Sequence, residues 1–233
     1  MLEALIFDVD GTLAETEELH RRAFNETFAA AGIGWHWDRE TYARLLRTTG
    51  GKERMAAYAE EIGEGAAALP IADLHAEKTR RYGDAMAEGG IALRPGIAEL
   101  IALGQAAGMS FAVATTTSAA NVDALCRAVF RRPAAQVFDV IAAGDMVARK
   151  KPAPDVYLLA LRLLGVEARH ALALEDSRNG VVSACAAGIA CIVSPGIYTA
   201  GEDFSGALAV CDSFVEIASR DRLEALLARS PAG

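Results

Sequence analysis

Short apolar runs that end at polar residues alternate with helix-like stretches along most of this chain. The first run covers residues 4–7 and ends at acidic residues and a glycine, as a buried strand does where it enters a loop. Runs at 111–114, 171–174 and 189–193 have the same character. Two weaker runs, at 137–142 and 208–210, predict two more strands.

Apolar residues at helical spacing dominate the segments between these strands. Leu19, Ala23, Phe24 and Phe28 predict a helix from residue 15 to about 31, with Gly32 as its stop. Residues 33–88 are mostly helical, with breaks at 48–51 and 63–65, and no strand is predicted there. Further helices are predicted at 95–107, 121–130, 155–164 and 181–187.

From residue 89 onward, strands and helices alternate, which is typical of a parallel sheet covered on both faces. The first strand has the character of that sheet, although a helical block separates it from the rest. The pattern therefore predicts a Rossmann-like, doubly wound α/β core formed by residues 1–15 and 89–233. Residues 16–88 are predicted to form a small inserted all-α cap domain.

Composition agrees with a folded protein that binds small molecules. The chain has 233 residues, 52% of them hydrophobic, with a mean hydropathy of +0.20 and a net charge of −8. Because it has no Lys/Arg tract, nucleic acid and anionic membranes are not expected partners. No secretory signal or membrane-length apolar run is present, so a cytoplasmic protein is expected. A negative field repels phosphate, so a phosphate site here must be built from local cations and backbone N–H groups.

The four cysteines show no metal-binding spacing. Cys126, Cys185, Cys191 and Cys211 lie in apolar or helical surroundings, without a Cys-x-x-Cys pair. We expect buried or half-buried thiols here, neither zinc ligands nor disulfides.

Polar side chains with chemical potential follow the predicted strands. Ligands bind at the carboxyl ends of the strands in open parallel sheets. The candidates at these ends are Asp8 and Asp10 after the first strand, Thr115 after the second, Glu175 and Asp176 after a later one, and Lys151 in a loop. Several carboxylates in one pocket need a cation, and oxygen ligands without His or Cys favour Mg²⁺ over zinc.

Each motif also has an ordinary structural interpretation. Asp-Val-Asp-Gly-Thr at 8–12 could be a simple turn, residues 115–118 a helix N-cap, 150–152 a solvated loop, and 175–177 a helix start. The occurrence of all four in order, each at an expected strand end, favours chemistry.

These four segments resemble the four motifs of the haloacid dehalogenase superfamily, over nearly the whole chain. The spacing and the helical insertion resemble its beta-phosphoglucomutase-like branch. Residues 14–25 (Ala-Glu-Thr-Glu-Glu-Leu-His-Arg-Arg-Ala-Phe-Asn) and 48–54 (Thr-Thr-Gly-Gly-Lys-Glu-Arg) are similar to the CbbY-type phosphatases within that branch.

The resemblance implies a covalent mechanism. Asp8 would be the nucleophile, attacking phosphorus in line to give an aspartyl phosphate. Asp10 would protonate the leaving sugar oxygen and then deprotonate the attacking water. For the first of these steps we expect the pKa of Asp10 to rise above its usual value of about 3.9.

The resemblance also implies a Mg²⁺ site and a phosphate site. The metal ligands would be the Asp8 carboxylate, the Asp10 backbone carbonyl and Asp176, with Glu175 orienting a metal-bound water. Three groups would neutralise the transferring phosphoryl group: Thr115, the Thr116 backbone N–H and Lys151.

Substrate choice is expected to depend mainly on the cap. Gly50 and Gly51 would let the backbone approach a ligand, next to cations at what reads as a helix N-terminus. The predicted substrate-binding residues of the cap are Glu17, His20, Gly50, Gly51, Lys52, Arg54, His75 and Lys78, joined by Ser118 and Asn121 from the core. Without the resemblance, solvated Lys and Arg side chains would be the default. His36 and His170 are expected at the surface, and Trp35 and Trp37 in cap packing.

The predicted function is that of a Mg²⁺-dependent sugar-bisphosphate phosphatase. The resemblance implies hydrolysis of xylulose 1,5-bisphosphate, a Rubisco inhibitor, to xylulose 5-phosphate and phosphate by a monomer that needs no stable complex with Rubisco. A beta-phosphoglucomutase-type mutase and a phosphoglycolate phosphatase are alternatives in the same branch. A catalytically inactive binding module on the same scaffold is the alternative from another class.

Overall fold

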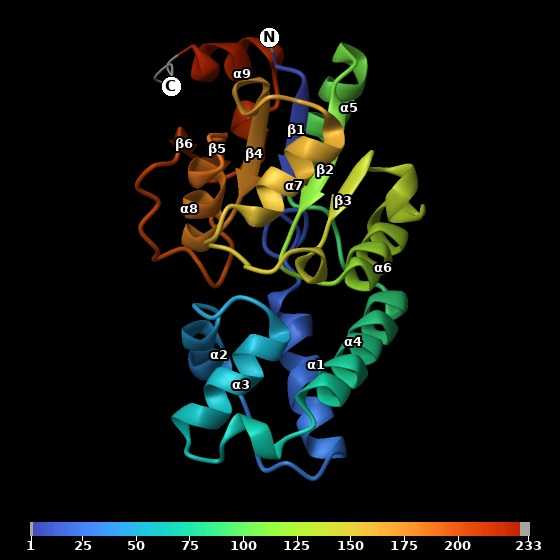
Figure 1. The fold of residues 1–233 in the computed structure, drawn as a ribbon. Coiled ribbons are helices and arrows are strands. Elements are labelled where there is room, and N and C mark those ends of the chain that lie inside the picture. Colours follow the sequence, from blue (N-terminus) through green and yellow to red (C-terminus); the bar gives the residue numbers. More distant parts are fainter. Residues whose placement is uncertain (1, 229–233) are drawn as a thin grey trace.

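A parallel sheet forms the centre of the larger part of the molecule (Figure 1). The computed structural model describes residues 2–228. Its six strands, all parallel, are ordered β3-β2-β1-β4-β5-β6. Their bounds are β1 Ala4–Phe7, β2 Ser110–Ala114, β3 Val140–Ala142, β4 Ala171–Glu175, β5 Ala190–Val193 and β6 Ala209–Val210. The predicted strands are therefore all present. The third strand begins at Val140 and not at residue 137 as predicted, because the 3₁₀ turn Ala134–Gln136 ends directly before the predicted start.

Helices cover both faces of this sheet, which confirms the predicted fold class. One face is covered by α5 (Ile97–Ala107), α6 (Ala119–Phe130) and α9 (Arg220–Leu227), and the other by α7 (Asp155–Leu164) and α8 (Arg178–Ala186). Side chains of β1 alternate between the two cores: Leu5 and Phe7 join the first, Ala4 and Ile6 the second. The sequence pattern did not predict α9.

The segment between β1 and α5 is a separate group of helices, here called the cap (residues 17–88). It contains α1 (Glu17–Ala30), α2 (Arg39–Leu45), α3 (Gly51–Glu61) and α4 (Ile71–Glu88). These helices enclose a hydrophobic cluster of their own, in which Trp35 and Trp37 are buried. Figure 1 places them below the carboxyl ends of the strands, next to α6 through α4. The exact domain limits at 16 and 88 stay a prediction.

Short 3₁₀ turns complete the connections. They span Ala66–Ala68, Ala134–Gln136, Gly144–Met146, Ala168–His170 and Phe214–Ile217. No helix in the part of the chain that the structure describes is long and apolar enough to cross a membrane.

Three of the four thiols are buried, and all four are free. Cys185 is exposed on α8, so the expectation of a buried or half-buried thiol is wrong there. Its helical turn faces solvent beside Gly206, whose carbonyl accepts a hydrogen bond from Sγ.

Candidate active site

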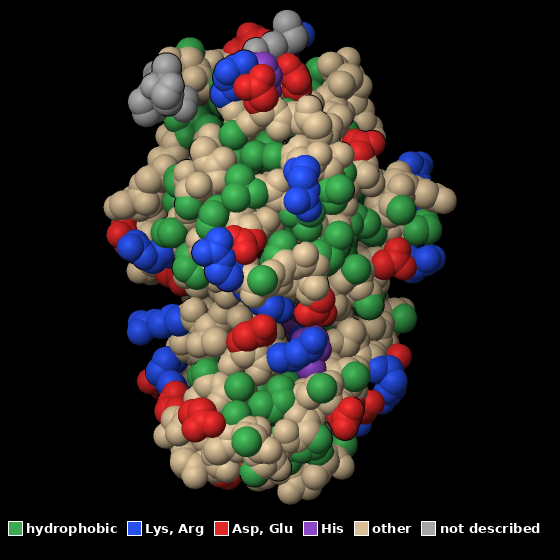
Figure 2. Space-filling view, viewed as in Figure 1, with side chains coloured by type: hydrophobic (Ala, Val, Ile, Leu, Met, Phe, Trp, Pro, Cys, Tyr) green, Lys and Arg blue, Asp and Glu red, His purple; other side chains and the backbone are tan. Residues whose placement is uncertain are grey.

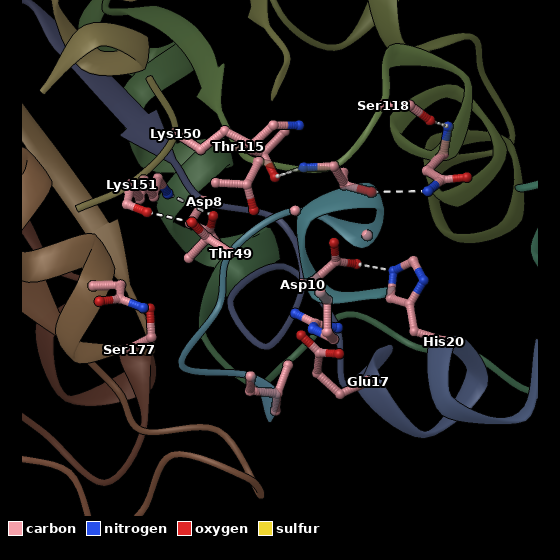
Figure 3. Close-up of a pocket in the computed structure, with 18 of the residues that line it drawn as sticks. Asp8, Asp10, Glu17, His20, Thr49, Thr115, Ser118, Lys150, Lys151 and Ser177 are labelled. Carbon is pink, nitrogen blue, oxygen red and sulfur yellow. Dashed lines mark hydrogen bonds and ion pairs between the residues drawn. The ribbon is translucent and has the colours of Figure 1, made fainter. Parts of the chain in front are cut away.

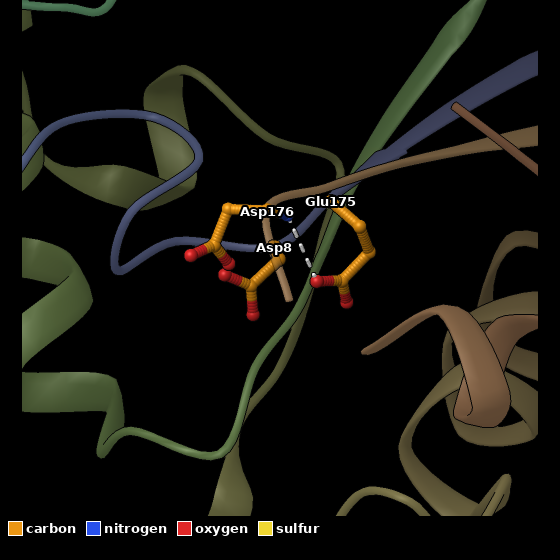
Figure 4. A group of neighbouring side chains, drawn as sticks. All are labelled: Asp8, Glu175 and Asp176. Atoms are coloured by element: carbon orange, nitrogen blue, oxygen red, sulfur yellow. Dashed lines mark hydrogen bonds between the residues drawn. The ribbon is translucent and has the colours of Figure 1, made fainter. Parts of the chain in front are cut away.

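Three carboxylates form the floor of a pocket between the sheet and the cap. Asp8 follows β1, while Glu175 ends β4 and Asp176 comes directly after it (Figure 4). Because β1 and β4 are hydrogen-bonded neighbours, their carboxyl ends bring one oxygen of each side chain within 4.8 Å of the others. All three side chains are buried.

Lys151 approaches this floor from the loop before α7. Its Nζ donates hydrogen bonds to Asp8 Oδ1 at 2.7 Å and to Glu175 Oε1 at 2.6 Å. The hydroxyl of Tyr157, on α7, donates to the same Glu175 oxygen at 2.6 Å. Gly180 on α8 leaves the room that the Glu175 carboxyl occupies, since a methyl group there would overlap it. Glu175 is thus fixed from both neighbouring helices.

Burial strongly affects the carboxyls of the floor. It raises the pKa of Asp8 to about 8, with Lys151 opposing the rise and Glu175 adding to it. Burial also raises the pKa of Asp176 well above its usual value, and the charges of Asp8 and Glu175 add to this effect. One lysine does not balance three carboxylates. A hard divalent cation fits this all-oxygen set and would stabilise the ionised forms.

Asp10 lies beside this floor. It is held by residues of the cap and of the segment that leads into the cap, here called the first linker (residues 12–16). Its Oδ1 accepts a hydrogen bond from Thr16 at 2.5 Å and one from His20 Nε2 at 2.9 Å (Figure 3). On the other side of the imidazole, Nδ1 contacts Lys78 Nζ. Because a carboxylate oxygen can only accept, His20 Nε2 carries a proton and donates to Asp10.

The pKa of Asp10 is about 2, so the expected upward shift is wrong for this arrangement. Burial raises the pKa, but the charge of His20 and the hydrogen bonds from His20 and Thr16 lower it more. Asp10 is therefore a carboxylate here, ready to accept a proton. Burial also lowers the pKa of Lys78 to about 7.

The loop after β2 forms one side of the pocket. Thr115 is buried at the strand end, and its Oγ1 accepts the Thr117 backbone N–H at 3.2 Å. Ser118 is the N-cap of α6 and accepts the Asn121 N–H at 3.3 Å. The Asn121 side chain donates to Thr117, while its buried Oδ1 has no hydrogen-bond partner among the described residues. Thr116, Ser118 and Asn121 line the same pocket.

The cap contributes an acid and a cation joined by a tyrosine. Buried Tyr42 donates a hydrogen bond from its hydroxyl to Glu17 Oε2 at 2.6 Å. The same hydroxyl accepts one from Arg54 Nη1 at 3.0 Å, and the guanidinium lies 5.1 Å from the tyrosine ring centroid. Glu17 and Arg54 both line the pocket.

Glycines bring the start of α3 close to the pocket. Gly50 has a φ of +89°, which disfavours any side chain. A methyl group on Gly51 would lie 2.7 Å from the ring of His75 on α4. Burial lowers the pKa of His75 to about 4, with Lys78 adding to the effect, so the ring is neutral near pH 7.

At the mouth, charged residues of cap and core face each other, in the waist that Figure 2 shows as a band of charged and histidine side chains. Lys52 lies 3.5 Å from Asp145, outside the pocket lining that contains Arg54 and Lys78. Lys150 lies 3.5 Å from Glu53 and 3.6 Å from the same Asp145. The structure thus gathers the predicted residues in one pocket with two exceptions: Lys52 is at its rim, and Glu175 is the fully buried member of the floor and does not line the cavity.

Several residues of the site were not predicted as site residues from the sequence. They are Thr16, Tyr42, Thr49, Lys150, Tyr157, Gly180 and Thr199. Thr49 donates a hydrogen bond from the cap to the backbone carbonyl of Lys151. Thr16, Thr49 and Lys150 lie within segments that the sequence analysis singled out, so their position could have suggested a role. His36 is exposed and His170 partly exposed, both away from the pocket.

Residues 5–194 match the family model of haloacid dehalogenase-like hydrolases. The chain belongs to the haloacid dehalogenase-like hydrolase family. The predicted resemblance is confirmed, and so is the prediction of an enzyme of the phosphatase type. The four segments that the sheet of this chain brings together are the motifs predicted from its sequence.

Two curated relatives in this family carry the name CbbY. The chain is 64% identical over 217 residues to the protein CbbY of Cereibacter sphaeroides, covering 93% of this chain and 94% of that one. It is 49% identical to a plasmid-borne CbbY of Cupriavidus necator, covering 90% and 84%.

Solved structures also resemble the structure of this chain. A mutant of CbbY from Rhodobacter sphaeroides in complex with xylulose 1,5-bisphosphate matches with a TM-score of 0.93 and 62% identity, over 96% of this chain and 99% of that one. A beta-phosphoglucomutase from Clostridium difficile matches with a TM-score of 0.81 and 20% identity, over 98% of each chain, which shows the shared fold alone.

Proposed function

We propose that this enzyme is a Mg²⁺-dependent phosphatase that hydrolyses xylulose 1,5-bisphosphate to xylulose 5-phosphate and phosphate. The observation that carries the proposal is a pocket with two cationic ends. Lys151 lies beside Asp8 at the core end, while Arg54 and Lys78 line the cap end. A substrate with a phosphate at each end matches both, and a CbbY structure contains such a ligand.

In the first step, Asp8 attacks the phosphorus at the core end of the pocket. The bond between phosphorus and the sugar oxygen breaks, and an aspartyl phosphate forms on Asp8. Lys151 and the hydroxyl of Thr115 neutralise the phosphoryl oxygens. Tyr157 supports this arrangement indirectly, because it holds the Glu175 carboxyl that also accepts from Lys151.

Asp10 moves the protons. It gives a proton to the departing sugar oxygen, then accepts one from the water that hydrolyses the aspartyl phosphate. Since its pKa is about 2 in the substrate-free arrangement, Asp10 must take up its first proton as the phosphate dianion of the substrate enters. The negative phosphate raises the pKa of a nearby carboxyl, and the chain through His20 to Lys78 supplies hydrogen-bonded donors.

The residues that would hold Mg²⁺ are Asp8, Asp176 and the Asp10 backbone carbonyl. When bound, the ion would polarise the phosphoryl group and offset the charge of the carboxylates. Glu175 stays beneath these ligands, because its Oε1 is already used by Lys151 and Tyr157. Glu175 would orient a metal-bound water through Oε2, which also accepts the Asp176 backbone N–H at 3.3 Å.

The cap end supplies recognition of the second phosphate and the sugar. Arg54 would contact the distal phosphate, with His75 as a neutral donor beside it and Lys78 as a further cation. Glu17 and the free Oδ1 of Asn121 would accept hydrogen bonds from sugar hydroxyls. Lys52, at the rim, would add long-range attraction as the substrate enters.

Steady-state assays of phosphate release test this proposal. The enzyme would be offered xylulose 1,5-bisphosphate, and separately beta-glucose 1-phosphate with glucose 1,6-bisphosphate, with Mg²⁺ and with excess chelator. We expect stoichiometric phosphate from the first substrate, no glucose 6-phosphate from the second, and no turnover with chelator. Efficient formation of glucose 6-phosphate would make the enzyme a mutase. Turnover of phosphoglycolate above that of the bisphosphate would contradict the role of the cap end.

Hydrolysis of this bisphosphate would clear an inhibitor of Rubisco without contact between the two enzymes. We propose that the protein does this as a cytoplasmic monomer, since one chain supplies every group of the pocket. Size-exclusion chromatography with light scattering, alone and with added Rubisco, checks that the enzyme is a monomer and that it forms no stable complex with Rubisco.

A further inference from the structure

The loop after β5, residues 194–199, lies against Asp176. The Thr199 hydroxyl lies 2.7 Å from the Asp176 backbone carbonyl and 3.2 Å from its Oδ2. A methyl group on Gly196 would lie 2.9 Å from Oδ2. This loop, here called the Asp176 loop, therefore sets how far that carboxylate can move on one side.

The turn after β1 approaches the same oxygen, Oδ2 of Asp176. Gly11 has a φ of +87°, and a methyl group there would overlap the Asp176 carboxylate. A methyl group on Gly196 would also lie 3.5 Å from the Cα of Gly11. Two segments that are far apart in the sequence thus pack side by side against one carboxylate oxygen and restrict its movement.

The Arg94 guanidinium joins these two segments. Nη1 donates to the carbonyls of Gly11 and Ser194, the latter at 2.7 Å. Nη2 donates to Ser194 Oγ and to the Pro195 carbonyl, both at 2.8 Å. Nε lies 3.4 Å from Glu15 Oε1. The guanidinium thus makes four hydrogen bonds and one ion pair, and its side chain is only 11% exposed.

Arg94 belongs to the second linker, residues 89–96, which leads from the cap back to the core. Its contacts, however, are with the core and the first linker. Its backbone N–H donates to the Leu13 carbonyl at 2.8 Å. Glu15 accepts from the Ile197 N–H at 3.3 Å and so ties the first linker to the Asp176 loop. Gly89 and Gly90, with φ of +87° and +89°, lie between α4 and Arg94. The contacts of Arg94 named here therefore involve no residue of the cap.

We propose that Arg94 is a positioning residue that fixes the Gly11 turn and the Asp176 loop around Asp176 and thereby sets the affinity for the divalent cation. The proposal rests on the Mg²⁺ site of the proposed function. Only a planar fork reaches four acceptors on two segments at once, so lysine at this position keeps the charge and loses the geometry. Loss of groups that orient metal ligands typically weakens metal binding by about 10- to 100-fold.

Calorimetric titration of the substrate-free enzyme with Mg²⁺ tests this. For Arg94→Lys we expect a Kd for Mg²⁺ raised by about 10-fold or more. At saturating Mg²⁺ the KM for the sugar bisphosphate should stay within about twofold of the parent value, because no Arg94 contact named here reaches the cap end of the pocket. A merely structural role would lower the melting temperature and leave the Kd unchanged, which would overturn the proposal.

Arg81→Lys is the matched control. Arg81 is a half-buried arginine on α4 whose ion pairs are with Glu77 at 2.8 Å and Glu26 at 4.0 Å, both in the cap. We expect its Kd for Mg²⁺ to equal that of the parent. An equal rise in both variants would mean that loss of any half-buried arginine has this effect, and the proposal would be wrong.

Ser194→Ala provides a second, milder test that does not depend on the folding of Arg94→Lys. It removes one acceptor of Nη2 and leaves the arginine in place. A rise of the Kd by about two- to fivefold is expected, as for one lost hydrogen bond, and an unchanged Kd would count against the proposal. If the parent binds Mg²⁺ and these shifts occur while xylulose 1,5-bisphosphate is not hydrolysed, the proposed substrate fails and the role of Arg94 stands.

Discussion

The two ends of the pocket are built in different ways. At the core end, adjacent strands fix Asp8, Glu175 and Asp176, and Lys151 and Tyr157 reach them from the α7 side. At the cap end, Glu17, Arg54 and Lys78 come from three different helices and are held by other cap residues. Few hydrogen bonds join the two ends: one runs from Thr49 to the Lys151 carbonyl, and another from His20 to Asp10.

This difference separates two kinds of work. A sheet holds its strand ends in fixed relative positions, which suits in-line attack and charge neutralisation. Residues on the inner side of a helical cap can be substituted without changing the position of those strands. Damage to the core end should therefore affect every phosphate ester, and damage to the cap end only substrates that reach it.

The largest effect is expected for Asp8→Asn. The amide keeps the size of the side chain but removes the proposed nucleophile, so turnover should fall by at least about 10⁴-fold. Phosphate release should fall equally with xylulose 1,5-bisphosphate and with p-nitrophenyl phosphate. Retained turnover on either substrate would remove Asp8 from the mechanism.

Arg54→Met should separate the two ends most clearly. Losing a charged hydrogen bond costs about 1.5–3 kcal/mol, so kcat/KM for the bisphosphate should fall by about 10- to 100-fold. With p-nitrophenyl phosphate the change should be less than about threefold. Lys52→Met is the control, because its exposed pair with Asp145 predicts less than about a fivefold loss. Equal losses for Arg54→Met on both substrates would contradict the assignment of the cap end.

Two glycine substitutions compare the ends by steric means. Gly180→Ala places a methyl group against the Glu175 carboxyl and should lower stability by roughly 1–3 kcal/mol and turnover on both substrates. Gly51→Ala presses on the His75 ring at the cap end and should raise KM for the bisphosphate only. Thermal unfolding and steady-state kinetics check both. If Gly51→Ala slowed p-nitrophenyl phosphate as well, the ends would not be separable.

The smallest effect concerns Lys78 and pH. Burial lowers its folded pKa to about 7, with Asp10 opposing and Arg54 adding, whereas an unfolded lysine titrates near 10.5. Between these values the unfolded chain binds the extra proton, so the unfolding free energy should rise with pH, by up to about 1.4 kcal/mol per unit. Lys78→Met should lack this slope. Denaturant unfolding between about pH 7 and pH 10 measures it, and parallel slopes would show that Lys78 is not the source.

The core could be predicted almost completely from the sequence, because strand periodicity and motif position are local signals. Asp8, Thr115, Lys151 and Asp176 meet once the strands are parallel and adjacent. Tyr157 escaped prediction, since a tyrosine on an apolar helix face reads as core packing.

The cap was harder, because its contacts depend on how four helices pack. Tyr42 lies 25 residues from the Glu17 it binds, and nothing in the sequence links them. His20 was assigned to the substrate, yet its ring bonds Asp10 and stacks on Tyr82 with centroids 4.0 Å apart. The pKa of Asp10 was predicted in the wrong direction because the prediction considered neighbouring carboxylates and not His20 and Thr16.

The aromatic cluster of the cap has a practical consequence for spectroscopy. Both tryptophans of the chain, Trp35 and Trp37, belong to it, and the core contains none. Intrinsic tryptophan fluorescence is thus an optical probe of the cap alone, while far-ultraviolet circular dichroism reports on the whole chain. A mismatch between the two signals during heating or denaturant titration would reveal a cap that melts independently of the sheet, without any label or engineered residue.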